Sequence, residues 1–128
     1  MNTKEAKSIA LEMVEKYIKS KKYTVVEKNF VFKIPDTSLS TIIDIIAKKK
    51  DAIYFVIIKI LNQQGLSRLF SSNDKLGFWE RKKTIKAIEY WLSKNKTFSK
   101  SKWEVVTAHT TIDLANKKAK IIRFEAAQ

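Results

Sequence analysis

The hydrophobic and polar positions along the chain predict two helices and five strands. Between residues 2 and 20, apolar side chains recur at helical spacing, as at Ala10, Val14 and Ile18. This pattern predicts an amphipathic helix that starts at Asn2 or Thr3 and ends near Ser20. Farther along, β-branched and aromatic residues form runs typical of strands. The expected strands cover 23–34, 41–47, 52–60, 103–109 and 120–126.

This order of elements predicts an α/β or α+β fold, a mixed central sheet of about five strands flanked by helices. The first three strands should form an antiparallel meander. Its central strands are apolar on both faces, as in a sheet that is covered on both sides. The length of 128 residues fits a single domain with one core. Residues 61–78 hold both glycines and many polar side chains, so we expect a mobile loop there.

A second helix is expected over 79–94, and its first half carries a basic cluster. Positive charge near a helix N-terminus opposes the helix dipole, so local stability does not explain the cluster. Contact with phosphate would explain it, and a solvated lysine-rich surface is the alternative. The cluster consists of Arg81, Lys82, Lys83 and Lys86. The residues expected to face the core are Ile85, Ile88, Trp91 and Leu92.

Two polar residues interrupt the apolar hairpin, Asp44 in the second expected strand and Lys59 in the third. An ionised side chain in such surroundings costs free energy unless another group compensates its charge. Strand alternation would put Ile42 and Ile46 on the same face as Asp44, and Ile57 on the same face as Lys59. If the two faces coincide, Asp44 and Lys59 form an ion pair across the hairpin.

The charge of the chain favours a polyanionic partner. Lysine and arginine number 26 against 13 acids, a net charge of +13. Such a field attracts nucleic acid or an anionic membrane surface. Only three of these residues are arginine, the better reader of guanine edges, so we expect contacts to the DNA backbone with little sequence preference. The alternative is a biased composition that keeps the protein soluble.

Several kinds of site are excluded by composition. The chain has no cysteine, so it has neither a disulfide framework nor a thiolate metal site, which fits a reducing compartment. His109 is the only histidine, and a histidine-based metal cluster or triad lacks its parts. No glycine-rich phosphate loop appears.

The N-terminus is unlike a signal peptide, and no apolar run is long enough to span a membrane, so we expect a cytoplasmic protein.

The order and spacing of several motifs carry a resemblance. The chain reads KYTVVEKNF at 22–30, TIIDIIA at 41–47 and DAIYFVIIK at 51–59. The small bacterial YraN family (UPF0102) reads GY-x-I-L-x-x-N, G-E-I-D-L-I-A and D-x-x-V-F-V-E-V-K in the same order. ERKKTIKAIEYWL at 80–92, WEVV and IIRFEAA resemble that family's lysine-rich helix and last two strands. The family is similar to restriction endonucleases and Holliday-junction resolvases, which implies a restriction-endonuclease-like core.

Residue by residue, the resemblance implies a nuclease site that has lost two ligands. Asp44 matches the aspartate of G-E-I-D, and Lys59 matches the lysine of E-V-K, so both would be remnants of a catalytic motif. Ile42 and Ile57 stand where the family has glutamates. Nucleases of this class hold Mg²⁺ with two or more carboxylates, and the lysine helps to orient the attacking water. Because Mg²⁺ requires oxygen ligands, we expect neither a metal cofactor nor catalysis.

The resulting hypothesis is a catalytically degenerate nuclease-fold protein that binds DNA through its basic residues. The first alternative is an active metal-dependent DNA endonuclease with a rearranged site. In that case Mg²⁺ would be held by Asp44 together with a displaced carboxylate, Glu12 or Asp36. The second alternative is a protein-interaction module that captures a protein partner, or a second copy of itself, through residues 61–78 or an exposed strand edge.

Overall fold

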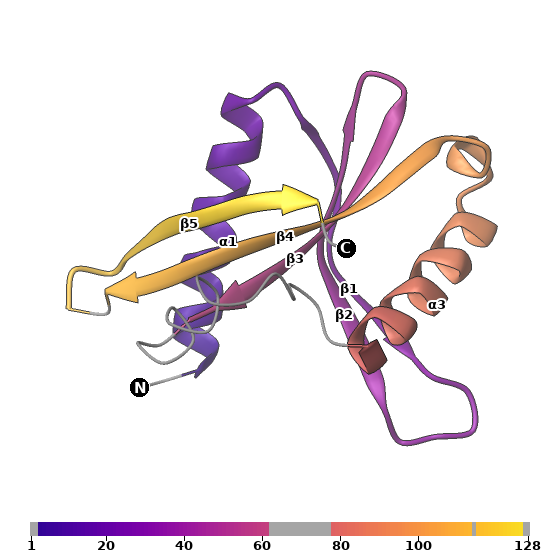
Figure 1. Cartoon of the computed structure of the whole chain (residues 1–128), viewed down its shortest axis with the longest axis horizontal. Helices are drawn as coiled ribbons and strands as arrows, with labels where there is room; N and C mark the ends of the chain where they lie inside the picture. Colours follow the sequence, from indigo (N-terminus) through magenta and orange to yellow (C-terminus); the bar gives the residue numbers. More distant parts are fainter. Residues whose placement is uncertain (1–2, 62–77, 114, 127–128) are drawn as a thin grey trace.

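A computed structural model describes residues 3–61, 78–113 and 115–126 of the chain, and shows an α+β fold (Figure 1). In chain order the elements are α1 (Thr3–Ser20), β1 (Thr24–Lys33), β2 (Ser40–Lys49), β3 (Ala52–Ile60), α3 (Phe78–Lys94), the 3₁₀ helix η1 (Lys96–Phe98), β4 (Lys102–Asp113) and β5 (Lys118–Ala126). All the elements expected from the sequence are present. The loop expected over 61–78 falls almost entirely outside the described residues. No helix in the described part of the chain is both long and apolar enough to cross a bilayer.

The five strands form one sheet whose spatial order follows the chain, β1-β2-β3-β4-β5. The first three strands pair antiparallel, as the meander prediction required. β3 and β4 are parallel, and β4 and β5 are antiparallel, so the sheet is mixed. The expected strand 103–109 is longer in the structure because β4 pairs with β3 along its first part and with β5 along its second. This is the architecture expected for a restriction-endonuclease-like core.

The two long helices cover opposite faces of the sheet, and each has its own apolar cluster. Ala10, Val14 and Ile18 of α1 pack against one face, which includes Ile45 and Val56. The other face packs against α3, and the buried residues of that cluster are Ile43, Ile46, Ile53, Phe55, Ile57, Ala87, Ile88 and Trp91. The central strands are therefore apolar on both faces because both faces are covered.

Polar contacts fix both helices on the sheet. Trp91 of α3 is buried, and its Nε1 donates a hydrogen bond to Oε1 of Glu27 at 3.0 Å. Glu27 follows a register shift in β1. On the other face, Glu15 of α1 bonds Lys19 of its own helix and Lys28 of β1, and these bonds hold the pKa of Glu15 below its ordinary value. The bond between Trp91 and Glu27 therefore helps to set where α3, and with it the basic cluster, lies on the sheet.

The prediction that Ile85 faces the core is wrong. Ile85 is 37% exposed, and the buried face of α3 follows Thr84, Ala87, Ile88 and Trp91. Those four residues have the i, i+3, i+4, i+7 spacing of one helical stripe. Ile85 follows Thr84 by one residue, about 100° around the helix axis, and lies at the edge of that stripe.

The turn after α1 places a lysine in the left-handed conformation. The N–H of Tyr23 bonds the carbonyl of Ile18 at 3.0 Å, and the N–H of Lys22 bonds that of Lys19 at 3.1 Å. This is the Schellman pattern that ends many helices, and its left-handed position favours glycine. Lys22 occupies that position with φ 73°. A side chain with a Cβ atom is strained there.

Replacing Lys22 by glycine should therefore stabilise the protein by about 1 kcal/mol, because glycine adopts positive φ without strain. The midpoint of urea unfolding should rise with an unchanged slope. Lys22→Ala is the control, since it removes the same charge but keeps the Cβ atom, and it should show no such gain. Equal midpoints for the two variants would contradict the strain argument.

Candidate functional site

The candidate site lies where two neighbouring strands separate. β2 and β3 lie entirely within the described residues. They pair from the hairpin turn as far as Ile45 and Val56. Beyond this pair β2 stays with β1, and β3 stays with β4. The fork opens a surface pocket of about 300 Å³, which we call the Asp44 pocket. It is lined by Lys7, Ser40, Thr41, Ile42, Asp44, Ile57, Ile58, Lys59, Glu80, Lys83 and Thr84.

Asp44 lies at the fork and is 1% exposed. One carboxylate oxygen, Oδ2, accepts a hydrogen bond of 2.7 Å from the N–H of Ile58. The other, Oδ1, lies 2.9 Å from Nζ of Lys7, a half-exposed lysine on α1. The carboxylate therefore satisfies a backbone donor that the separating strands leave without a β2 partner, and the ammonium group compensates its charge.

The regular alternation of β2 breaks at Asp44. Ile43 enters the cluster under α3 and Ile45 enters the cluster under α1, although the two residues are two apart. On β1, Asn29 lies between the residue pairs Lys28–Ile45 and Phe30–Ile43. It has φ 55°, a conformation that asparagine tolerates better than most residues. The expectation that Ile46 shares a face with Ile42 is wrong, because the alternation of β2 breaks between Ile43 and Ile45. Ile42 is 44% exposed, whereas Ile46 is fully buried.

The expected ion pair between Asp44 and Lys59 is not formed. Lys59 instead pairs with Glu80 in the first turn of α3, while Asp44 pairs with Lys7. Both ion pairs line the same pocket. The sequence argument missed Glu80 and Lys7. A glutamate in the first turn of a helix complements the helix dipole, and a lysine outside an apolar stripe is usually solvated, so neither residue stood out.

The residues of the pocket do not fit a magnesium ion. Ile42 and Ile57 line it where carboxylates would be needed, and the ammonium group of Lys7 already lies against Asp44. In the described part of the chain, no three acidic, histidine or cysteine side chains come close enough to hold a metal. Three ammonium groups, from Lys7, Lys59 and Lys83, face two carboxylates. The pocket thus carries net positive charge, which favours an anion over Mg²⁺.

The two acids proposed as displaced ligands lie elsewhere. Glu12 lines a different pocket with Lys16, at an ion-pair distance of 3.4 Å, and its side chain is 70% exposed. Asp36 is exposed in the turn between β1 and β2, with φ 63°. His109 is buried on β4 at the position paired with Lys59, but it does not line the Asp44 pocket.

The basic cluster of α3 is divided by the structure. Lys83 lines the Asp44 pocket and also a second pocket, where Lys82 and Lys86 join it. Arg81 lines neither of these two pockets. We call these three lysines the lysine strip of α3; it begins at the Asp44 pocket with Lys83.

Comparison with known proteins is consistent with the motifs. A UPF0102 protein of Fervidobacterium nodosum is 36% identical over 101 residues, which cover 77% of this chain and 68% of the relative. A UPF0102 protein of Clostridioides difficile is 33% identical over 95 residues, covering 74% of this chain and 75% of the relative. The chain belongs to the UPF0102 family. No family model matches the chain. Membership confirms the resemblance to this family that the motifs indicated.

The contact between Lys7 and Asp44 should be important for stability. Lys7→Met should destabilise the protein by about 1–3 kcal/mol, because it leaves a buried carboxylate without its counter-charge. In the double variant Lys7→Met/Asp44→Asn the two losses should not add, and the coupling free energy should reach about 1 kcal/mol or more. Urea unfolding of the wild type, both single variants and the double variant measures this coupling.

Lys16→Met is the matched control on the same helix. Lys16 pairs with Glu12, but both side chains are mostly exposed, so its loss should cost no more than about 0.5 kcal/mol. Equal losses for Lys7→Met and Lys16→Met would show that the Asp44 pair contributes no more than an ordinary surface ion pair.

Proposed function

We propose that this UPF0102 protein is a catalytically degenerate nuclease-fold protein that binds nucleic acid by electrostatic contact with the phosphate backbone. The observation that carries the proposal is the ion pair between Lys7 and Asp44. It places an ammonium group of the protein against the carboxylate that a nuclease of this fold would offer to a metal. A pocket with this charge balance attracts a phosphate group and does not prepare it for hydrolysis.

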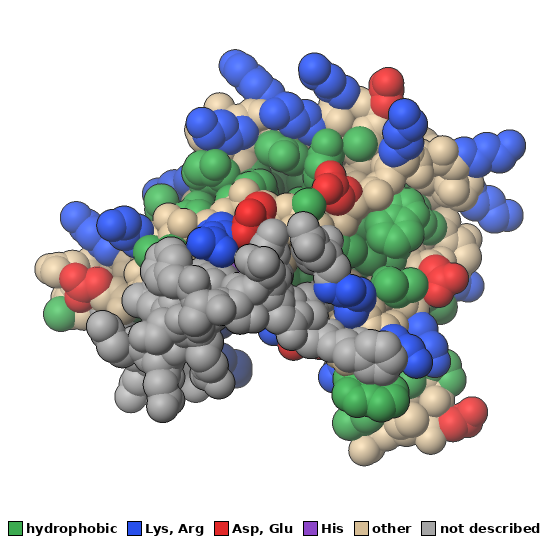
Figure 2. All heavy atoms as spheres, viewed as in Figure 1, with side chains coloured by type: hydrophobic (Ala, Val, Ile, Leu, Met, Phe, Trp, Pro, Cys, Tyr) green, Lys and Arg blue, Asp and Glu red, His purple; other side chains and the backbone are tan. Residues whose placement is uncertain are grey.

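The wider surface supports a polyanionic partner. Lys and Arg side chains line much of the outline of the molecule, and acidic side chains are fewer (Figure 2). The lysine strip of α3 begins at the Asp44 pocket, so a phosphate chain crossing the pocket would continue along Lys83, Lys82 and Lys86. Lysine acts as a point charge toward phosphate, so the interface should discriminate little between sequences.

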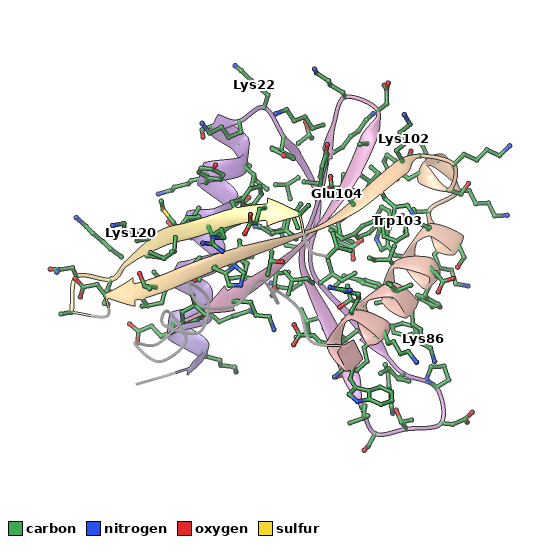
Figure 3. All side chains as sticks on the ribbon, in the orientation of Figure 1. Lys22, Lys86, Lys102, Trp103, Glu104 and Lys120 are labelled. Carbon is green, nitrogen blue, oxygen red and sulfur yellow. The ribbon has the colours of Figure 1, made fainter. Side chains whose placement is uncertain are left out.

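Binding should depend on this strip and not only on total charge. Affinity for duplex DNA should fall steeply with salt, and the triple variant Lys82→Ala/Lys83→Ala/Lys86→Ala should lower the slope of log K against log salt by about 2–3. The matched control replaces Lys96, Lys100 and Lys102 by alanine, the same change in net charge. These lysines are exposed near the start of β4, and Lys102 lies far from Lys86 (Figure 3). Fluorescence anisotropy at several salt concentrations measures both slopes. Equal slopes for the two triple variants would show that the α3 lysines do not contact the DNA.

A second candidate function, an active metal-dependent endonuclease, is favoured by one observation. Glu80 and Asp44 line the same pocket from different elements, so the site keeps two carboxylates. Each carboxylate, however, already pairs with a lysine. We therefore expect no cleavage of duplex, branched or single-stranded DNA with Mg²⁺ or Mn²⁺. Asp44→Ala serves as the control, and metal-dependent cleavage by the wild type that disappears in Asp44→Ala would establish the nuclease.

A further inference from the structure

A second pocket lies beside the Asp44 pocket, between α3 and the turn that joins β1 to β2, with a volume of about 570 Å³. Ile34 and Leu39 from the turn, and Trp79 and Ile85 from α3, form its apolar wall. Trp79 is 71% exposed and Leu39 is 55% exposed. We call this pocket the Trp79 groove. Exposed apolar side chains gathered in a groove are typical of a binding site.

The charge of the groove identifies the kind of ligand. Lys82, Lys83 and Lys86 line it together with the apolar residues, and Nζ of Lys82 lies 5.3 Å from the centre of the Trp79 ring. A ligand that matches this lining has a flat apolar part and an anionic part close together. A nucleotide has both, since its base can stack on an indole ring and its phosphate can contact ammonium groups. Glu89 also lines the groove, so three lysines lie with one carboxylate and the lining keeps a net positive charge.

Stacking on Trp79 requires an unpaired nucleotide, and the neighbouring pocket allows its phosphate chain to continue. Lys83 lines both the Asp44 pocket and the Trp79 groove, so a phosphate chain that contacts the first can continue into the second. Bases inside a duplex are stacked on their neighbours, and only an unpaired base presents a free face to a side chain. We propose that the Trp79 groove binds unpaired nucleotides of a single strand by stacking a base on Trp79. This inference rests on the proposed function.

The test compares two single strands that differ only in their bases. One is an oligothymidylate of about ten nucleotides, and the other has the same number of phosphates on an abasic backbone. The protein carries Trp103→Phe, which leaves Trp79 and the buried Trp91 as the remaining tryptophans. Oligothymidylate should quench the fluorescence of Trp79 and bind about tenfold more tightly than the abasic strand.

Variants of Trp79 assign this difference to the ring. Trp79→Ala should bind the two strands equally, and Trp79→Phe should restore part of the preference because phenylalanine keeps an aromatic face. Circular dichroism confirms that the variants fold, as expected for a side chain that is mostly exposed. Affinity for blunt duplex DNA should be the same in Trp79→Ala as in the wild type.

The outcomes separate this proposal from the proposed function. Equal affinity of the Trp103→Phe protein for the two strands, with duplex binding retained, would overturn stacking and leave electrostatic binding intact. Absence of binding to every nucleic acid would overturn both. A third outcome would assign the groove to a second copy of the chain and overturn the proposal. In that case the Trp79 fluorescence would not change when oligonucleotide is added, it would shift with protein concentration, and sedimentation would show a dimer.

Discussion

The buried carboxylate of Asp44 is the constraint on which the site depends. It lies where β2 and β3 separate, and it accepts the N–H of Ile58 while facing the ammonium group of Lys7. A carboxylate buried this deeply is tolerated only with such partners. The same contacts join both sides of the fork to the first helix, so the geometry of the pocket and the position of α1 are coupled.

Both carboxylates of this pocket are paired within the chain. Two isoleucines stand where the family pattern has glutamates, and ammonium groups of the chain lie against the carboxylates that remain. Apolar residues at these two positions and lysines beside the acids both make the local charge more positive. With three lysines against two carboxylates, the lining of this pocket carries a net positive charge.

The sequence predicted the elements well because their signals are local. Apolar periodicity places the helices and strands, and motif spacing identifies Asp44 and Lys59. The partners of those residues were not predictable, since Lys7 and Glu80 reach the pocket from helices that are distant in sequence. The shared face of Ile42 and Ile46 was also mispredicted, because strand alternation assumes a regular strand and the alternation of β2 breaks between Ile43 and Ile45. The burial of Ile85 was mispredicted for a similar reason. Neighbouring residues of a helix point about 100° apart, so Thr84 is buried while Ile85 is exposed.

The strand order has a consequence for how the chain folds. Because the strands lie in the sheet in the order of the sequence, β1, β2 and β3 can pair through short turns as soon as they are made. The parallel pair β3–β4 is different, since it joins Ala52 to Lys102 across α3. Closing such a long loop is slow compared with forming a hairpin. Until it closes, β3 presents an unpaired apolar edge, and that interval is when the chain is most exposed to aggregation.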